Sequence, residues 1–129
     1  MLQKIEHYVS ALAQLEQAVA IYQKSHQDAL YRDGLIQRFE FTVELAWKSI
    51  KEYLEDQGCT TPIATPRAVL KEAFAAGVIQ NAEAWNKVIT ARNVTSHVYD
   101  EQTAIDVAEQ ISNDFLPLLQ ELRRFYRDE

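Results

Sequence analysis

Apolar residues recur at alternating steps of three and four positions along most of the chain, which is the spacing that places them on one side of an α-helix. The first stripe runs over residues 2–22 and is followed by a polar stretch, residues 25–28. The second runs over residues 36–54 and is followed by Gly58, which suits a left-handed helix cap. The pattern predicts two long amphipathic helices joined by a short polar connection.

Helix-capping residues divide the rest of the chain. Thr65 and Pro66 suit the start of a short helix, and Asn81 suits the cap of a longer one that should end near residues 94–95. Asp100 suits the cap of the last helix, which Pro117 should kink. Four long helices and one short one predict an all-α fold, an up-down four-helix bundle with one additional short helix. We expect it to form a single domain over residues 1–129.

The second long helix has apolar residues on more than one side. Phe41 and Leu45 fall outside its main stripe, so the helix should bury two faces. One face can pack inside the subunit, and the other favours contact with a second protein surface, so we expect a dimer. Glu40 and Glu44 lie one turn apart on this helix and are interpreted as part of a solvated face.

The composition limits the class of function. A formal net charge of −6 argues against a protein that coats nucleic acid, although it allows a local basic pocket. Cys59 is the only cysteine, which indicates a reducing, cytoplasmic location, and no apolar run reaches the length of a membrane span. The sequence contains no His-Glu-x-x-His motif, no cysteine pair and no glycine-rich phosphate loop. We therefore expect neither a bound metal nor a cofactor.

Arg92 is conspicuous because it continues an apolar stripe. It lies seven residues after Trp85 and therefore shares the inward side of its helix. A guanidinium keeps its charge at any relevant pH and needs a partner when it is buried. One interpretation is structural: the side chain reaches past the stripe to water, or it pairs with a carboxylate of another helix. The other is functional: its planar fork of donors contacts a phosphate.

Asn93, His97 and Tyr99 follow Arg92 closely in the sequence. They add an amide, a titratable imidazole and a phenol to the guanidinium. Histidine exchanges a proton near neutral pH, which suits acid–base catalysis. A histidine at a helix junction can equally be a structural hydrogen-bonding residue or a helix cap. From the residues alone both interpretations stay open.

The spacing Arg92-x4-His97-x-Tyr99 resembles the signature of HEPN-domain proteins, which are helical bundles and include many metal-independent ribonucleases. Residues 37–48 (QRFEFTVELAWK) are similar to the second-helix motif of one branch of that family, the nucleotidyltransferase substrate-binding proteins. The same branch is resembled at Pro66-Arg67, at Glu72-Ala73-Phe74 with Gly77, and at residues 92–97. The similarity extends over nearly the whole chain.

This resemblance implies a homodimer in which the signature of each subunit faces a shared cleft. It also implies a partner, a minimal nucleotidyltransferase encoded next to this chain. In relatives of the HepT type, the HEPN protein is a toxin that cleaves RNA, and the nucleotidyltransferase is the antitoxin that adenylylates the tyrosine. Carried over, Arg92 and His97 are expected to be catalytic, Asn93 to be a supporting polar residue, and Tyr99 to be the modification target. The alternative is a non-catalytic subunit that presents a substrate or nucleotide to that nucleotidyltransferase.

Overall fold

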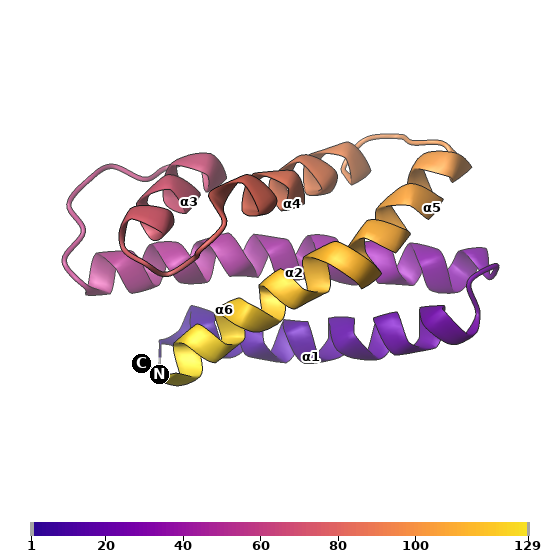
Figure 1. The fold of residues 1–129 in the computed structure, drawn as a ribbon, viewed down its shortest axis with the longest axis horizontal. Helices are drawn as coiled ribbons and strands as arrows, with labels where there is room; N and C mark the ends of the chain where they lie inside the picture. The colour runs from indigo at the N-terminus through magenta and orange to yellow at the C-terminus, as the bar shows by residue number, and fades with distance from the viewer. Residues whose placement is uncertain (1, 129) are drawn as a thin grey trace.

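The structure is a computed structural model that describes residues 2–128, and all regular elements in that range are helical. In chain order they are α1 (Gln3–Lys24), α2 (Ala29–Asp56), α3 (Pro66–Ala75), α4 (Ala82–Thr95), α5 (Glu101–Gln110), the π-helical turn η1 (Ile111–Phe115) and α6 (Leu116–Asp128) (Figure 1). The all-α prediction is confirmed, and α5, η1 and α6 together form the predicted last helix. Among these residues, no helix combines the length and apolarity needed to cross a membrane.

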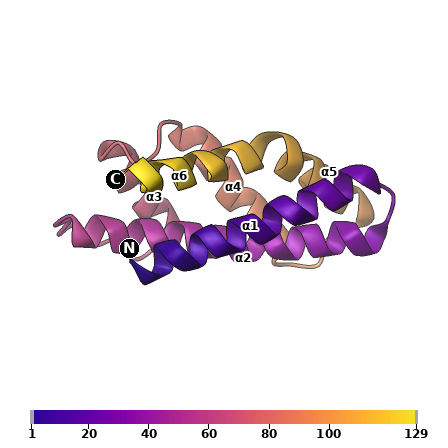
Figure 2. The ribbon, with the colours of Figure 1, turned by 90° about the horizontal axis from the view of Figure 1, so that it is seen from below.

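The helices α1 and α2 lie side by side and run in opposite directions (Figures 1 and 2). Their apolar stripes face each other, so that Leu12 of α1 and Leu35 of α2 are fully buried. Burial of a side chain of this size contributes about 1.5–3 kcal/mol to stability. On α2, Phe39 stacks on Phe115 with ring centroids 5.6 Å apart. The last helix therefore closes the core against α2.

Side-chain caps fix where the helices begin. Three of them are the predicted ones: Thr65, Asn81 and Asp100 accept hydrogen bonds from the backbone N–H groups of residues 68, 84 and 103, at 3.2, 3.0 and 2.8 Å. The fourth is Asp28, which accepts from Leu30 N at 2.9 Å, so that α2 begins one turn or more before the predicted stripe. Gly58 has a φ of 95°, as a left-handed cap requires.

The predicted kink at Pro117 takes the form of a π-helical turn. Pro117 has no N–H, and its ring would collide with the carbonyl four residues earlier in an α-helix. The chain widens just before it, and Leu116 N donates to Ile111 O in place of the carbonyl four residues back. The direction of the chain changes between α5 and α6 (Figure 1). This bend carries α6 back across α1.

Candidate functional site

The helix α4 carries the first part of the candidate site. Its inward stripe buries Trp85, Val88 and Ile89. Arg92 follows on the same side, and its side chain is 31% exposed. The position of Arg92 on the burial stripe, which the spacing predicts, is therefore confirmed. The helix ends at Thr95, where the two β-branched residues led us to expect the end.

Arg92 pairs with a carboxylate of another helix. Its Nη2 lies 3.4 Å from Oε2 of Glu44 on α2, and the Glu44 side chain is 34% exposed. Lys48 contacts the other oxygen of the same carboxylate at 3.3 Å. The Nε atom of Arg92 is buried and has no hydrogen-bond partner among the described residues. The guanidinium is thus oriented by Glu44 while part of its donor capacity stays unused.

A second contact joins the same two helices one turn further on. The hydroxyl of Thr95 donates to Oε2 of Glu40 at 2.9 Å and lies 3.1 Å from the carbonyl oxygen of Arg92. The interpretation of Glu40 and Glu44 as a solvated face is therefore wrong. Both carboxylates turn toward α4, because α4 packs antiparallel along the side of α2 next to its apolar stripe.

His97 and Asn93 are exposed at the end of α4. The chain leaves the helix in a tight turn, in which Ser96 Oγ donates to Asn93 O at 2.8 Å and His97 N donates to Val94 O at 3.3 Å. Within residues 2–128, neither the imidazole of His97 nor the amide side chain of Asn93 makes a hydrogen bond or ion pair. Both are available to a ligand, and the imidazole of His97 does not act as a helix cap.

Tyr99 lies half-buried in the loop between α4 and α5. Burial raises the pKa of its phenol, and the nearby carboxylates of Asp33 and Glu40 raise this pKa further, whereas Arg32 lowers it. All three are residues of α2. The phenol therefore stays protonated beside an acidic face of α2 that also holds Thr95.

Arg32 occupies a core position at the start of α2 and is 6% exposed. Its Nη2 lies 3.9 Å from Oε1 of Glu101, whose side chain is 78% exposed, and its Nε has no hydrogen-bond partner among the described residues. A buried guanidinium with one distant partner is weakly compensated. The loop that carries Tyr99 therefore lies over a positive charge as well as the acidic residues of α2.

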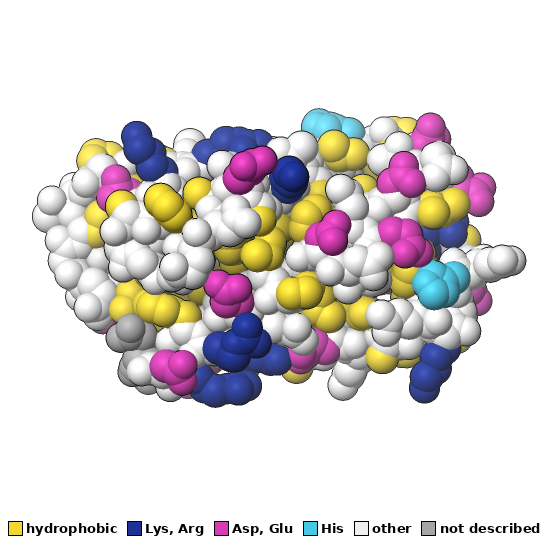
Figure 3. Space-filling model, viewed as in Figure 1, with side chains coloured by type: hydrophobic (Ala, Val, Ile, Leu, Met, Phe, Trp, Pro, Cys, Tyr) yellow, Lys and Arg dark blue, Asp and Glu magenta, His cyan; other side chains and the backbone are white. Residues whose placement is uncertain are grey.

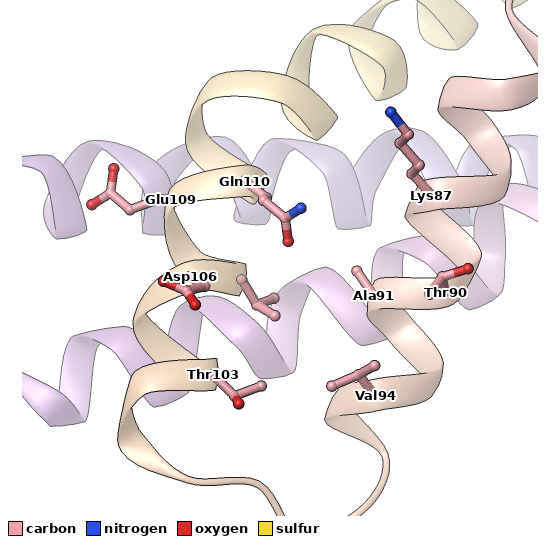
Figure 4. Close-up of a pocket in the computed structure, with 9 residues that line it drawn as sticks. Lys87, Thr90, Ala91, Val94, Thr103, Asp106, Glu109 and Gln110 are labelled. Carbon is pink, nitrogen blue, oxygen red and sulfur yellow. The ribbon is translucent and has the colours of Figure 1, made fainter.

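An open groove of about 780 Å³ lies between α4 and α5. Lys87 and Thr90 of α4 and Asp106 and Glu109 of α5 are among the residues that line it. In Figure 4 the side chains of Ala91, Val94 and Gln110 point into the space between the two helices, whereas Glu109 points away from α4. Lys87 on α4 and Asp106 on α5 thus place opposite charges on the two sides of the groove. Over residues 2–128, no three histidine, cysteine or carboxylate side chains are grouped so as to hold a metal ion.

The structure places Arg92, Asn93 and His97 near the end of α4, with Arg92 on the side that faces α2 and with Asn93 and His97 exposed, and it places Tyr99 just beyond them. Sequence reasoning missed the side of the site formed by α2, above all Glu44, Glu40 and the buried Arg32. The signal was present in part, because residues 33, 40 and 44 share one side of a helix. What the pattern could not give is that α4, and not water, covers this side.

Fold and site together define a class of protein. It is an all-helical chain that presents an arginine, a histidine and a tyrosine at the junction of two helices, against an acidic face of a third. Comparison with known families assigns it more closely. The chain belongs to the HepT-like family described as nucleotidyltransferase substrate binding protein like, whose model matches residues 3–128. The branch that the motifs resemble is thereby confirmed.

Individual relatives agree with this assignment. A Haemophilus influenzae protein named probable ribonuclease HepT is 37% identical over 105 residues, which are 76% of this chain and 70% of that protein. A solved structure from Haemophilus influenzae, described as the fold of a substrate binding domain of a nucleotidyltransferase, has a TM-score of 0.83 and 30% identity, covering 95% of this chain and 98% of that one. A crystal structure from Thermus thermophilus has a TM-score of 0.77 and 28% identity, covering 92% of this chain and 98% of that one.

Proposed function

We propose that the chain is the HEPN-type toxin of a toxin–antitoxin pair, a metal-independent endoribonuclease that acts as a homodimer. Its antitoxin is a minimal nucleotidyltransferase that silences it by nucleotidylating Tyr99. One observation carries the proposal: an unpartnered imidazole, His97, stands one turn beyond a half-buried guanidinium, Arg92, at the end of one helix. The name of the ribonuclease relative from Haemophilus influenzae supports the same chemistry.

An apolar stripe on α2 supports the homodimer. Leu30, Gly34 and Phe41 lie on one side of this helix together with the exposed Gln37, and Leu30 is 75% exposed and Phe41 is 61% exposed. A Cβ atom at Gly34 would have no atom within 4 Å, so the surface of α2 is open there. Val98, beside His97 in the sequence, is fully exposed. A second copy of the chain packed on this stripe would bury it and bring two copies of the loop together about a two-fold axis.

The dimer would supply the two proton carriers that RNA cleavage needs. One His97 takes the proton of the ribose 2′-hydroxyl, whose oxygen attacks the adjacent phosphorus. The bond from phosphorus to the 5′-oxygen breaks, and His97 of the second copy gives that oxygen its proton. The products are a 2′,3′-cyclic phosphate and a free 5′-hydroxyl. Arg92 stabilises the charge on the phosphate oxygens, and Asn93 supplies an amide for ordering the substrate.

Nucleotidylation of Tyr99 would block this chemistry. The phenol oxygen attacks the α-phosphorus of a nucleoside triphosphate, loses its proton, and releases pyrophosphate. The bound nucleotide then adds bulk and negative charge two residues from His97, where an RNA phosphate would otherwise lie.

In the assembly proposed here, α1, α2, α4 and the last helix form an up-down four-helix bundle, with α3 as the additional short helix.

A second function is favoured by the contact between Arg92 and Glu44. The site would bind RNA weakly, because the carboxylate of Glu44 already pairs with the guanidinium of Arg92 and because the chain carries a net charge of −6. The protein would then be a non-catalytic subunit that presents a substrate or nucleotide to its nucleotidyltransferase. Co-expression with the neighbouring nucleotidyltransferase followed by mass spectrometry separates the two functions. An added nucleotide on Tyr99 favours the toxin, and a stable complex without modification or RNA cleavage favours the binding subunit.

The cleavage itself is tested by incubating the purified protein with labelled single-stranded RNA in EDTA. We expect cleavage by the wild-type protein and a loss of at least about 100-fold in His97→Ala, since general acid–base catalysis contributes that much or more. His7→Ala is the matched control, because His7 is exposed on α1. Cleavage that is absent, or that His97→Ala retains in full, would overturn the ribonuclease proposal.

A further inference from the structure

Arg67, near the start of α3, is fixed against α4 by two neutral partners. Its Nη1 donates to Oδ1 of Asn86 at 3.1 Å, and its Nη2 donates to Oγ1 of Thr90 at 3.1 Å. The side chain is exposed, and within residues 2–128 it takes part in no ion pair. Two hydrogen bonds thus orient the guanidinium while its charge stays uncompensated. Arg92, by contrast, is neutralised by Glu44.

The two residues that hold Arg67 share a side of α4 with Asn93, and the candidate catalytic histidine lies in the turn just beyond the end of this helix. Asn86, Thr90, Asn93 and His97 follow one another at steps of four, three and four positions. All four side chains can form hydrogen bonds, and none is a carboxylate. From Asn86 to the end of the helix near His97 the distance is about 16 Å, at about 1.5 Å per residue. Arg67 therefore stands at the far end of a neutral, polar strip that leads to His97.

The charges on the neighbouring surfaces favour this strip as the place where a negatively charged ligand would bind. On the groove side, Asp106 of α5 would repel a phosphate, whereas Lys87 of α4 would attract it (Figure 4). In the space-filling view, Lys and Arg side chains lie along the upper edge over α3 and α4, with an acidic side chain between them, and acidic side chains gather over α5 (Figure 3). A polyanion on this part of the molecule is thus drawn to α4 and away from α5.

On its other side the strip borders α2, and the contacts between the two helices set the level of each residue. Glu40 meets Thr95 and Glu44 meets Arg92, so the antiparallel register places Asn86 level with residues 49–50 of α2, next to Lys51. Among the described residues Lys51 also has no ion pair. It lines a hollow on α2 together with Trp47, Lys4, Lys48 and two carboxylates, those of Glu52 and Glu55.

We propose that Arg67 is a substrate-positioning residue that binds an RNA backbone phosphate away from the cleaved bond, on a strand that runs along α4 from His97 to Asn86 and Thr90. A bidentate guanidinium suits a phosphodiester, and its two neutral partners hold it ready without competing for the charge. The proposal rests on the proposed function for its substrate class, single-stranded RNA. It assigns to the motif at Pro66-Arg67 a role in holding the substrate.

The test is fluorescence anisotropy of a labelled single-stranded RNA, made in the His97→Ala background so that the probe stays intact. We expect Arg67→Gln to weaken binding about tenfold and Arg67→Lys to weaken it less. The slope of log affinity against log salt should fall by about 0.7 in Arg67→Gln, the value for one lost phosphate contact with a single strand. Arg124→Gln is the matched control, because it removes the same charge from an exposed position on α6. Circular dichroism checks that each variant is folded.

The outcomes separate this inference from the function on which it rests. Binding that depends on Arg67 while the protein with intact His97 fails to cleave in EDTA supports the phosphate site and overturns the ribonuclease. Cleavage with an unchanged affinity and salt slope in Arg67→Gln overturns the phosphate site alone. An equal loss in Arg124→Gln, or no RNA binding by any form, also overturns it.

Discussion

The guanidinium of Arg92 lies 3.4 Å from the carboxylate of Glu44, 48 residues away along the chain. The contact joins the end of α4 to the middle of α2. It also means that a phosphate arriving at Arg92 competes with a carboxylate already in place. The pair is about one-third exposed on both sides, so that competition is possible without unfolding the site.

Replacing Glu44 should free Arg92 for its ligand. We expect Glu44→Gln to tighten RNA binding about fivefold, because a pair this exposed is worth about 1 kcal/mol. Anisotropy with labelled RNA in the His97→Ala background measures it. Glu55→Gln is the control, since Glu55 is exposed on the same helix and its loss changes the net charge equally. Equal gains in both variants would show that only net charge matters.

Replacing the buried Arg32 at the start of α2 should not lower the free energy of unfolding by much. Arg32 is 6% exposed and its one ion-pair partner is 3.9 Å away. The attraction to this partner therefore offsets only a small part of the free-energy cost of burying the guanidinium. We expect Arg32→Met to leave the free energy of unfolding unchanged or to raise it by about 1 kcal/mol. Urea denaturation measures this, beside Arg38→Met, which removes a 2.8 Å hydrogen bond to Gln14 O. A loss of more than about 3 kcal/mol in Arg32→Met would indicate a strongly paired charge.

The contact between α1 and α6 should make the free energy of unfolding depend on pH. Both oxygens of Glu16 accept from Arg123, at 2.7 and 2.8 Å, and this hydrogen bonding lowers the pKa of Glu16. A lowered pKa in the folded state stabilises the fold above the unfolded value of about 4.3, and the gain is lost as pH falls through the folded pKa. Glu16→Gln should therefore destabilise by about 1 kcal/mol at pH 7 and progressively less below pH of about 4.

Thermal or urea unfolding at a series of pH values checks this. Glu121→Gln on α6 is the control, because Glu121 is exposed and its replacement should leave the profile of the wild-type protein intact. A difference between Glu16→Gln and wild type that stays constant from neutral to acid pH would contradict the assignment.

Charging the exposed stripe of α2 should prevent association. Phe41 is 61% exposed, so Phe41→Glu should keep the fold of the subunit while disfavouring its burial against a second copy. We expect sedimentation to give a dimer for the wild-type protein and a monomer for the variant, with RNA cleavage lost as well. Phe74→Glu on α3, 51% exposed and outside the stripe, should remain a dimer. A wild-type monomer that cleaves RNA would show that one chain is sufficient.

The helices could be predicted from the sequence because the information for them is local. The stripes at steps of three and four gave α1 and α2, and hydroxyl, amide or carboxylate caps at Thr65, Asn81 and Asp100 marked three later starts. The apolar stripe over residues 36–54 begins later than α2 itself, because the first two turns of this helix are largely exposed. There only the cap at Asp28 marks the boundary.

The site could be predicted only in part. Helical phase made Arg92 conspicuous, and family resemblance added His97 and Tyr99. The structural interpretation of Arg92, a pair with a carboxylate of another helix, is confirmed. The sequence could not identify Glu44 as that carboxylate or Arg32 as a neighbour of Tyr99, because both are distant in sequence from the residues they meet. Long-range packing determines which side of α2 contacts α4, and the spacing of residues within one helix does not predict it.

Mixing wild-type protein with His97→Ala after subunit exchange tests most directly whether two copies build one site. If each site needs both histidines, only dimers of two wild-type chains cleave, and an equal mixture retains about one quarter of the wild-type rate at the same total protein. The rate is followed on labelled RNA in EDTA, with His7→Ala in place of His97→Ala as the control mixture. A rate that falls only to about one half would show that each chain carries a complete site, and would contradict the shared site.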